Sequence, residues 1–279
     1  MLDYSIKLPK IRRLAPVGFY VKSEFQKTAR FFLKNIRKRA IMQSYQYETG
    51  GIGVKSFDRL PAAFQCDAVR PYYDKLCKKT ASLVVKRIFD IVVALVMLAF
   101  LILPILVIAV LVKATSPGHV FFRQERVTTY GRRFRIFKFR TMVENAEALG
   151  TQVTTDGDSR VTKIGRVLRK YRLDELPQIF NVLGGSMSFV GTRPEVPRYV
   201  EQYEPEYYAT LLLPAGVTSL ASIMYKDEEK LLSSAENADR VYMETVLPEK
   251  MKYNLKYVKH FGFFSDIGLM FKTVKEVVS

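Results

Sequence analysis

The sequence predicts an α+β protein that is mainly helical, with a small β-hairpin and a re-entrant helix-break-helix membrane segment. Three observations lead to this prediction. A run of 22 residues without a polar side chain, Ile91 to Val112, lies a third of the way along the chain. A stretch of interleaved basic and apolar residues follows it, and two amphipathic segments with helix start and stop signals come next. With 48% hydrophobic residues, the 279-residue chain can bury a substantial core.

We expect three parts: a basic N-terminal extension over residues 1–80, a membrane hairpin over residues 81–117 and a soluble domain over residues 118–279. Residues 1–87 hold 19 Lys/Arg against 6 Asp/Glu, so +13 of the total net charge of +17 precedes the end of this stretch. Such a segment attracts polyanions, whether anionic lipid, nucleic acid or nucleotide. An apolar stripe between its basic residues indicates a helix that lies on a membrane surface or packs on the domain, and both alternatives stay open. The stripe consists of Phe25, Ala29, Phe32 and Ile36.

Cysteine and histidine are too scarce for several classes of site. Cys66 and Cys77 form no CxxC pair, so neither a disulfide framework nor a zinc site is indicated, and a reducing, cytoplasmic setting fits. His119 and His260 are the only histidines, which argues against a histidine-based triad or a multi-histidine metal site.

The apolar run would reach about 33 Å as a straight helix, enough to cross a bilayer. Pro104 lies inside it, removes a backbone hydrogen bond and clashes with the preceding turn, so a kink or break is expected there. Basic residues flank both ends, Lys86 and Arg87 before the run and Lys113 after it, and cytoplasmic flanks are typically basic. A helix that enters, breaks at Pro104 and returns satisfies this rule, whereas an ordinary transmembrane helix would leave one basic flank outside.

A β-hairpin is predicted next, with strands Val120 to Arg126 and Arg133 to Phe139 around a turn at Thr128 to Gly131. The alternation of the second strand slips at Phe137, which indicates a β-bulge.

Such a bulge would turn two basic residues, Lys138 and Arg140, to another face of the hairpin. There they could bind an anion, whereas Arg133 and Arg135 are expected to be solvated.

Asp174 and Glu175 stand side by side at the start of the second amphipathic segment. Asp174 is predicted as the helix N-cap with Glu175 in the first turn, and Gly184 and Gly185 end the helix. Many aspartates in this position only cap a helix. A helix N-terminus also offers free N–H groups to phosphate and keeps a carboxylate ionised, as a nucleophile or metal ligand must be. The predicted buried stripe consists of Leu176, Ile179, Phe180 and Leu183.

Basic residues frame this acidic pair. Arg169 lies on one face of the preceding basic helix together with Arg166 and Lys170. After the pair, Gly191 would let backbone approach a ligand closely, and Pro194 holds Arg193 extended. Carboxylates, a helix end that suits phosphate and convergent arginines favour phosphoryl transfer, with Mg²⁺ bridging acid and phosphate.

From about Val85 to Phe271 the chain resembles the bacterial sugar transferases, which are monotopic polyprenyl-phosphate phosphoglycosyl transferases. The resemblance implies a re-entrant helix-break-helix in the cytoplasmic leaflet of the bacterial inner membrane. The chain departs from the common family pattern at Leu103, Ser186 and Thr192, and "LPAGVTSLAS" lacks the arginine found there in many members. The motifs that carry the resemblance are "KRIFDIVVAL", "FKFRTM", "DSRVTKIGRVLRKYRLDELPQIFNVL", "MSFVGTRPE" and "LKYVKHFGFFSDIGLMFKT".

The same resemblance implies a reaction. Asp174 would attack the β-phosphate of a nucleotide diphosphate sugar, a UDP-sugar being expected, and polyprenyl phosphate would then take the phosphosugar from the aspartate. Glu175 would help Asp174 to hold Mg²⁺, and Arg169 and Arg193 would bind phosphate. The domain over residues 118–279 would then be a phosphoglycosyl transferase facing the cytoplasm, which initiates exopolysaccharide or other surface glycan synthesis.

Two other classes compete with this interpretation. A non-catalytic basic membrane scaffold that recruits glycan-synthesis enzymes would use the same charges and apolar run, but would not require the acidic pair. Nucleic-acid binding needs basic and aromatic residues on one accessible face, whereas the charge here clusters beside a membrane segment, so no nucleic-acid partner is expected.

Overall fold

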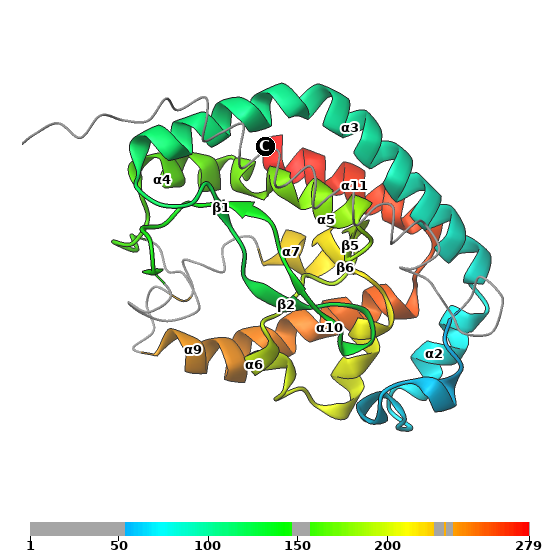
Figure 1. Cartoon of the computed structure of the whole chain (residues 1–279). Coiled ribbons are helices and arrows are strands. Elements are labelled where there is room, and N and C mark those ends of the chain that lie inside the picture. Colours follow the sequence, from blue (N-terminus) through cyan, green and yellow to red (C-terminus); the bar gives the residue numbers. More distant parts are fainter. Residues whose placement is uncertain (1–53, 147–156, 226–231, 233–236, 279) are drawn as a thin grey trace, which may run out of the picture.

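The structure is a computed structural model and describes residues 54–146, 157–225, 232 and 237–278. In Figure 1 one long helix arches over a body in which the other helices and short strands lie. The basic helix expected around Phe25 to Ile36 lies outside the described residues.

Residues 57–77 pack on the main hydrophobic core. They form the 3-10 helices η1 (Phe57–Arg59) and η2 (Ala62–Phe64) and the helix α2 (Arg70–Cys77). Phe64 and Leu76 are almost completely buried in this core. The described end of the expected N-terminal extension is therefore part of the folded body.

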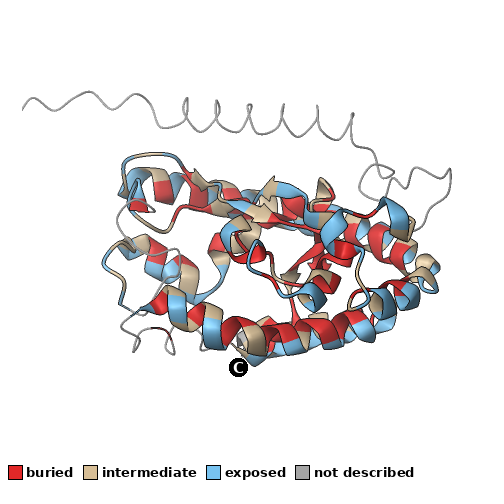
Figure 2. Ribbon diagram, turned by 90° about the horizontal axis from the view of Figure 1, so that it is seen from below, coloured by how far each residue is buried: buried red, intermediate tan, exposed pale blue. Residues whose placement is uncertain are grey.

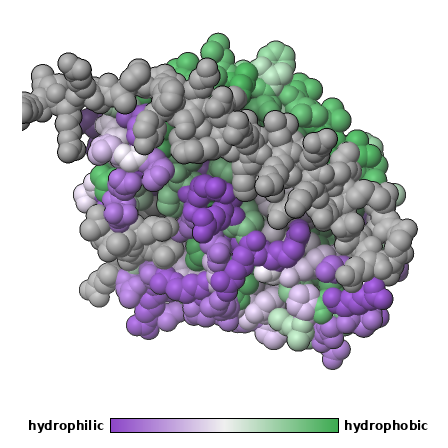
Figure 3. Space-filling model, in the orientation of Figure 1, coloured by the Kyte–Doolittle hydropathy of each residue, from purple (hydrophilic) through white to green (hydrophobic). Residues whose placement is uncertain are grey.

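The apolar run forms helix α3 (Thr80–Thr115). Here the structure differs from the expected helix-break-helix, because α3 continues through Pro104 and curves as one arc (Figure 1). Among the described residues, α3 is the helix long and apolar enough to cross a membrane, and only 17% of its most apolar window is buried. Figure 3 shows the resulting hydrophobic band along the arc. Large exposed apolar side chains of α3 include Val85, Ile88, Val92, Leu95, Val96, Phe100, Leu103, Val107 and Leu111.

Polar side chains fix the start of α3 to the body. Their hydrogen bonds join Lys86 Nζ to Asp266 Oδ2 and to Val190 O, Arg87 to the carbonyls of Val182 and Leu183, and the Phe189 N–H to Asp90 Oδ1. Lys86, Arg87 and Asp90 are all buried.

Apolar packing fixes the other end of α3 to the same body. Ile105, Ile108 and Val112 are buried in a second cluster that also contains Phe139 and Leu168. Because both halves of α3 rest on one body, the helix follows its surface, and the disturbance at Pro104 is absorbed as curvature instead of a break.

The hairpin has the predicted strands and turn but no bulge. β1 (Phe121–Phe122) pairs with β4 (Lys138–Phe139), and β2 (Glu125–Val127) pairs with β3 (Arg133–Arg135), around the turn η3 (Thr129–Gly131). The register is the same in both pairs, so no extra residue is inserted and the predicted bulge is wrong. The ladder is instead interrupted by Asn181, which accepts the Phe137 N–H and donates to Arg135 O.

The body continues with short helices and a parallel strand pair. Its elements are α4 (Lys163–Lys170), η5 (Leu173–Gln178), α5 (Ile179–Leu183), β5 (Met187–Val190), α6 (Pro197–Val200), η6 (Pro205–Leu212), β6 (Ala215–Thr218) and α7 (Leu220–Met224). β5 and β6 pair in parallel, an arrangement that the sequence did not predict. Thr162 is the N-cap of helix α4, and its side chain accepts the Gly165 N–H.

The C-terminal part supplies long helices beneath α3. It contains α9 (Ala238–Val241), the π-helix η7 (Tyr242–Val246), α10 (Leu247–Lys259) and α11 (Phe263–Val278). Helix α11 contacts α3, and α10 contacts α2. In Figure 2 the helices are buried on one side and exposed on the other, which is the pattern of amphipathic helices around a shared core.

Candidate active site

The acidic pair lies in the first turn of the 3-10 helix η5, which leads directly into α5. Arg172 occupies the N-cap position in the left-handed conformation, with a φ of 55°. The predicted N-cap role of Asp174 is therefore wrong, because the N-cap lies two residues earlier, at Arg172, and the helix begins at Leu173. The predicted helix end is confirmed, since α5 stops at Leu183 before the two glycines.

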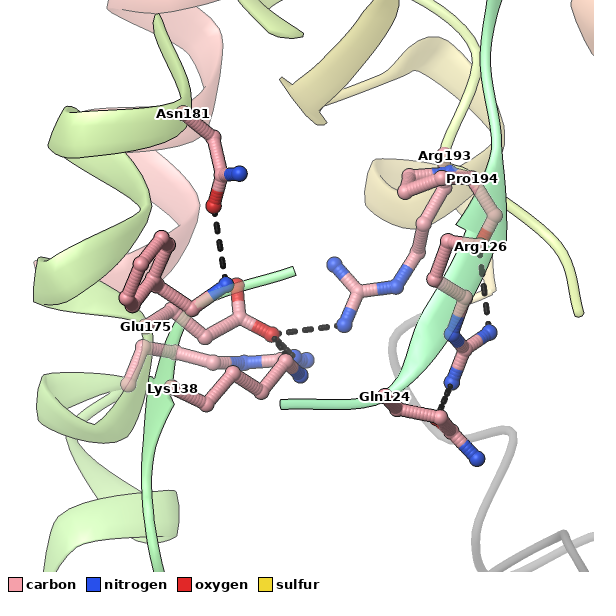
Figure 4. Close-up of polar contacts among 9 residues, drawn as sticks. Gln124, Arg126, Lys138, Glu175, Asn181, Arg193 and Pro194 are labelled. Atoms are coloured by element: carbon pink, nitrogen blue, oxygen red, sulfur yellow. Dashed lines mark hydrogen bonds and ion pairs between the residues drawn. The ribbon is translucent and has the colours of Figure 1, made fainter. Parts of the chain in front are cut away.

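Glu175 is gripped by basic side chains from three parts of the chain (Figure 4). Its Oε1 lies 2.8 Å from Lys138 Nζ, 2.6 Å from Arg193 Nη2 and 3.9 Å from Arg172 Nη1. Burial alone would raise the pKa of Glu175, but Arg193 and Lys138 more than offset it and hold this pKa well below its usual range. Glu175 is thus a fixed anion that orients two cations.

The contacts of Asp174 differ from those of Glu175, although the two residues are adjacent in sequence. It is 7% exposed, and its carboxylate makes no hydrogen bond or ion pair with any residue that the structure describes. Burial raises its pKa, Lys138 opposes this, and the Glu175 carboxylate raises it further. Asp174 is therefore the acid of the pair that remains available for a reacting partner.

Two more predicted cations belong to this electrostatic environment. The charge of Arg169 on α4 lowers the pKa of Asp174, as does that of Arg193. Burial lowers the pKa of Lys138, and Glu175 opposes that change. The structure thus brings together Lys138, Arg169, Asp174, Glu175 and Arg193, as the sequence predicted.

Arg140, another predicted anion-binding residue, has a different position. Its Nη2 donates to the carbonyl and the hydroxyl of Ser116, at the C-terminal end of α3. A cation there complements the negative end of the helix dipole. Arg140 therefore caps the C-terminal end of α3, and its hydrogen bonds to described residues go to Ser116 and not to the acidic pair.

Gly191 is required for chain packing. A Cβ atom at this position would collide with backbone atoms of Gly216 on strand β6 and of Pro214 just before it. Gly191 was predicted to let a ligand approach the backbone. Instead, the backbone of residues 214–216 fills the space beside it.

The segment of residues 190–195 that carries Arg193 is tied down along its length. Its hydrogen bonds join Val190 O to Lys86 Nζ, the Gly191 N–H to Thr218 O, Thr192 O to the Gly216 N–H, Pro194 O to Arg126 Nη1 and Glu195 O to the Val127 N–H. Figure 4 shows Arg126 beside Pro194, with Arg193 reaching toward Glu175. Arg193 therefore extends from a rigid backbone, as binding of a charged group requires.

Sequence reasoning missed two residues of this arrangement. Asn181 joins the hairpin to α5, and its signal was a polar residue within an otherwise apolar helix face. Arg126 supports the Arg193 segment, but nothing in the sequence connects β2 to a stretch almost 70 residues later.

The carboxylates fit a magnesium ion only in part. Within the described ranges, no group of three or more His, Cys, Asp and Glu side chains could hold a metal ion. Mg²⁺ often binds through one or two carboxylates and completes its coordination with substrate phosphates and water. The unpartnered Asp174 carboxylate, with Glu175 beside it, fits an ion that arrives together with a phosphorylated substrate.

Residues 81–279 match the model of a protein family described as bacterial sugar transferase. The chain belongs to this family. Similar proteins include a UDP-N-acetylgalactosamine-undecaprenyl-phosphate N-acetylgalactosaminephosphotransferase of Aeromonas hydrophila, 37% identical over 198 residues, which are 70% of this chain and 44% of that protein. A UDP-glucose:undecaprenyl-phosphate glucose-1-phosphate transferase of Xanthomonas campestris is 36% identical over 200 residues, 70% of this chain and 39% of that protein.

This bacterial sugar transferase spans about two fifths of the length of those two relatives. A shorter relative, the UDP-glucose:undecaprenyl-phosphate glucose-1-phosphate transferase of Caulobacter vibrioides, is 33% identical over 198 residues, 70% of either chain. The matched region begins at the start of α3. It includes the acidic pair and the basic residues around it, Lys138, Arg169, Arg172 and Arg193.

Proposed function

We propose that the protein transfers a phosphosugar from a UDP-sugar to polyprenyl phosphate. This transfer would initiate the synthesis of exopolysaccharide or another surface glycan. The observation that carries this proposal is the contrast within the acidic pair. Glu175 forms ion pairs with Lys138 and Arg193. The buried Asp174 carboxylate beside it has no hydrogen-bond or ion-pair partner among the described residues. Relatives named as UDP-sugar transferases acting on undecaprenyl phosphate support the donor and the acceptor.

The reaction would proceed in two displacements. An Asp174 carboxylate oxygen attacks the β-phosphorus of the donor, and the bond from this phosphorus to the bridging oxygen breaks. UMP leaves with the bonding electron pair. A phosphate oxygen of polyprenyl phosphate then attacks the same phosphorus, which releases the Asp174 carboxylate and yields polyprenyl diphosphate sugar. Two displacements at one centre let the two substrates use the site in turn.

The basic frame would bind and orient the donor. Arg193 and Lys138 already lie within 2.8 Å of an anionic oxygen, that of Glu175, and a diphosphate presents the same kind of oxygen. Arg169 adds positive charge beside Asp174 and so helps to keep it ionised for attack. A magnesium ion held by Asp174 and Glu175 would neutralise phosphate charge when bound.

The membrane arrangement is part of the proposal. Both ends of α3 rest on the same body, so its exposed apolar face can enter one leaflet without either end crossing to the far side. Basic residues near both ends favour the cytoplasmic leaflet of the inner membrane and contact with anionic lipid. The lipid acceptor would then reach a site that faces the cytoplasm.

A direct assay separates this function from a scaffold role. Purified full-length protein in detergent is incubated with a panel of UDP-sugars, Mg²⁺ and undecaprenyl phosphate, and UMP release is measured. At least one sugar should give UMP that depends on the acceptor for multiple turnovers. Absence of UMP release with every UDP-sugar, in protein that remains folded, would favour the scaffold.

A further inference from the structure

Glu195, two residues after Arg193, is a buried carboxylate that the proposed reaction does not use. It is 7% exposed, and its Oε1 accepts a hydrogen bond from Tyr242 Oη at 2.7 Å. Lys250 Nζ lies 3.6 Å from the same oxygen and donates to Tyr242 Oη at 3.0 Å. Lys250 and Tyr242 are also buried, so this ionic cluster is withdrawn from solvent.

Core stability alone does not explain why charged residues occupy these buried positions. A buried ion pair gains little stability over apolar residues of the same volume, because removing charges from water is costly. Such a cluster is better suited to fixing a backbone in one position. Here it anchors Glu195 from the α10 side, while the Val127 N–H of β2 binds the Glu195 carbonyl from the other side.

The link from Glu195 back to Arg193 is short and stiff. Pro194 has a fixed φ, and the residue before a proline is restricted to extended conformations. Arg126 Nη1 binds the Pro194 carbonyl at 3.1 Å (Figure 4). A shift of Glu195 is therefore transmitted to Arg193 and cannot be absorbed between them.

Charge gives Glu195 a second effect on the same arginine. Glu195 and Arg193 act on Arg126 in opposite directions. Burial lowers the pKa of Arg126, the charge of Glu195 raises it and the charge of Arg193 lowers it. The Glu195 carboxylate thus offsets the repulsion between the two arginines, while Arg193 Nη2 donates to Glu175 Oε1.

From these contacts we infer that Glu195, held by Tyr242 and Lys250, is a positioning residue for Arg193 and thereby for recognition of the donor diphosphate. The inference rests on the proposed role of Arg193 in phosphate binding. Glu195 acts through Arg193 and does not touch the substrate. Its loss should therefore matter only while Arg193 is present.

A double-mutant cycle tests this dependence. Binding of UDP to the full-length protein is measured by calorimetry for the wild type, Glu195→Gln, Arg193→Ala and the double variant. Arg193→Ala should weaken binding about tenfold or more, since a hydrogen bond to a charged group is lost. Glu195→Gln should weaken binding at least about threefold alone, as coupled neighbours do, and have almost no effect once Arg193 is alanine.

Asp239→Asn is the matched control, because Asp239 also accepts from a tyrosine hydroxyl, that of Tyr199, and from Arg198, while these hydrogen bonds go to α6 and not to residues 190–195. It should leave UDP binding unchanged. If Glu195→Gln does not fold, as judged by its melting temperature, Tyr242→Phe replaces it, since this change removes one hydrogen bond and keeps the ring. Equal effects of the Glu195 or Tyr242 change with and without Arg193 would overturn the inference but leave the proposed function standing. Unchanged UDP binding in Arg193→Ala would overturn both the inference and the proposed phosphate role of Arg193.

Discussion

Asp174 and Glu175 are adjacent in sequence, yet their pKa values shift in opposite directions. Glu175 faces Arg193 and Lys138 directly, which outweighs its burial, whereas burial dominates at Asp174. The helix dipole acts on both residues and so cannot separate them. Their different roles arise from which side chain the cations reach, and this geometry could not be predicted from the sequence.

A pH profile follows from these shifts. In the proposed reaction Asp174 must be ionised to attack, so the acid limb of the single-turnover rate of UMP release without acceptor, measured at subsaturating UDP-sugar, reports its pKa. Glu175→Gln removes an anion that raises the Asp174 pKa, so in the residual activity the limb should move to lower pH. Lys138→Met removes a cation that lowers the same pKa, so the limb should move to higher pH. Limbs that move in the same direction, or remain fixed, would show that Asp174 does not govern the rate.

Among the elements, α3 has the largest consequence for function. Cysteines at Ala81 and Ala114, two exposed positions at opposite ends of the helix, test its arrangement in cells in a background without Cys66 and Cys77. If both ends rest on one cytoplasmic body, neither cysteine should react with an impermeant thiol reagent until the membrane is permeabilised. Labelling of one position in intact spheroplasts would show that the helix spans the bilayer.

One side-chain amide from α5 bridges the interruption in the hairpin ladder. Asn181 is buried, and it binds both Arg135 O and the Phe137 N–H where the ladder is interrupted. Asn181→Ala should cost about 2–3 kcal/mol, because buried backbone groups lose their partners. For a chain of this size that corresponds to a melting temperature lower by roughly 5–10 °C. Gln202→Ala, which removes one exposed bond to Arg198 O, is the control and should shift the melting temperature little.

At this scale the sequence predicted what local patterns determine. The hairpin strands, the basic helix α4 and the end of α5 before Gly184 depend on neighbouring residues and were found where expected. The β5–β6 pair joins segments 28 residues apart and the predicted bulge was replaced by a distant amide, so neither could be inferred from local alternation.

The fold of the whole molecule connects the apolar helix α3 to the candidate site. Lys86 at the start of α3 binds Val190 O, and the chain reaches Arg193 three residues later. Arg140 binds the C-terminal end of the same helix. Lys138, two residues before Arg140, donates a hydrogen bond to Glu175. Lys138 and Arg193, two cations of the site, therefore extend from segments that also hold α3. The basic frame was predictable from residue types, whereas this mechanical connection required the structure.

The central claim is that Asp174 carries the phosphosugar, and intact-protein and peptide mass spectrometry tests it most directly. Wild-type protein given a UDP-sugar that supports turnover, without polyprenyl phosphate, should gain the mass of one phosphosugar on the peptide that contains Asp174. Asp174→Asn, an almost isosteric change, should remain folded, gain no mass and release no UMP. A phosphosugar found on any other residue, or full turnover by the folded Asn variant, would contradict the account.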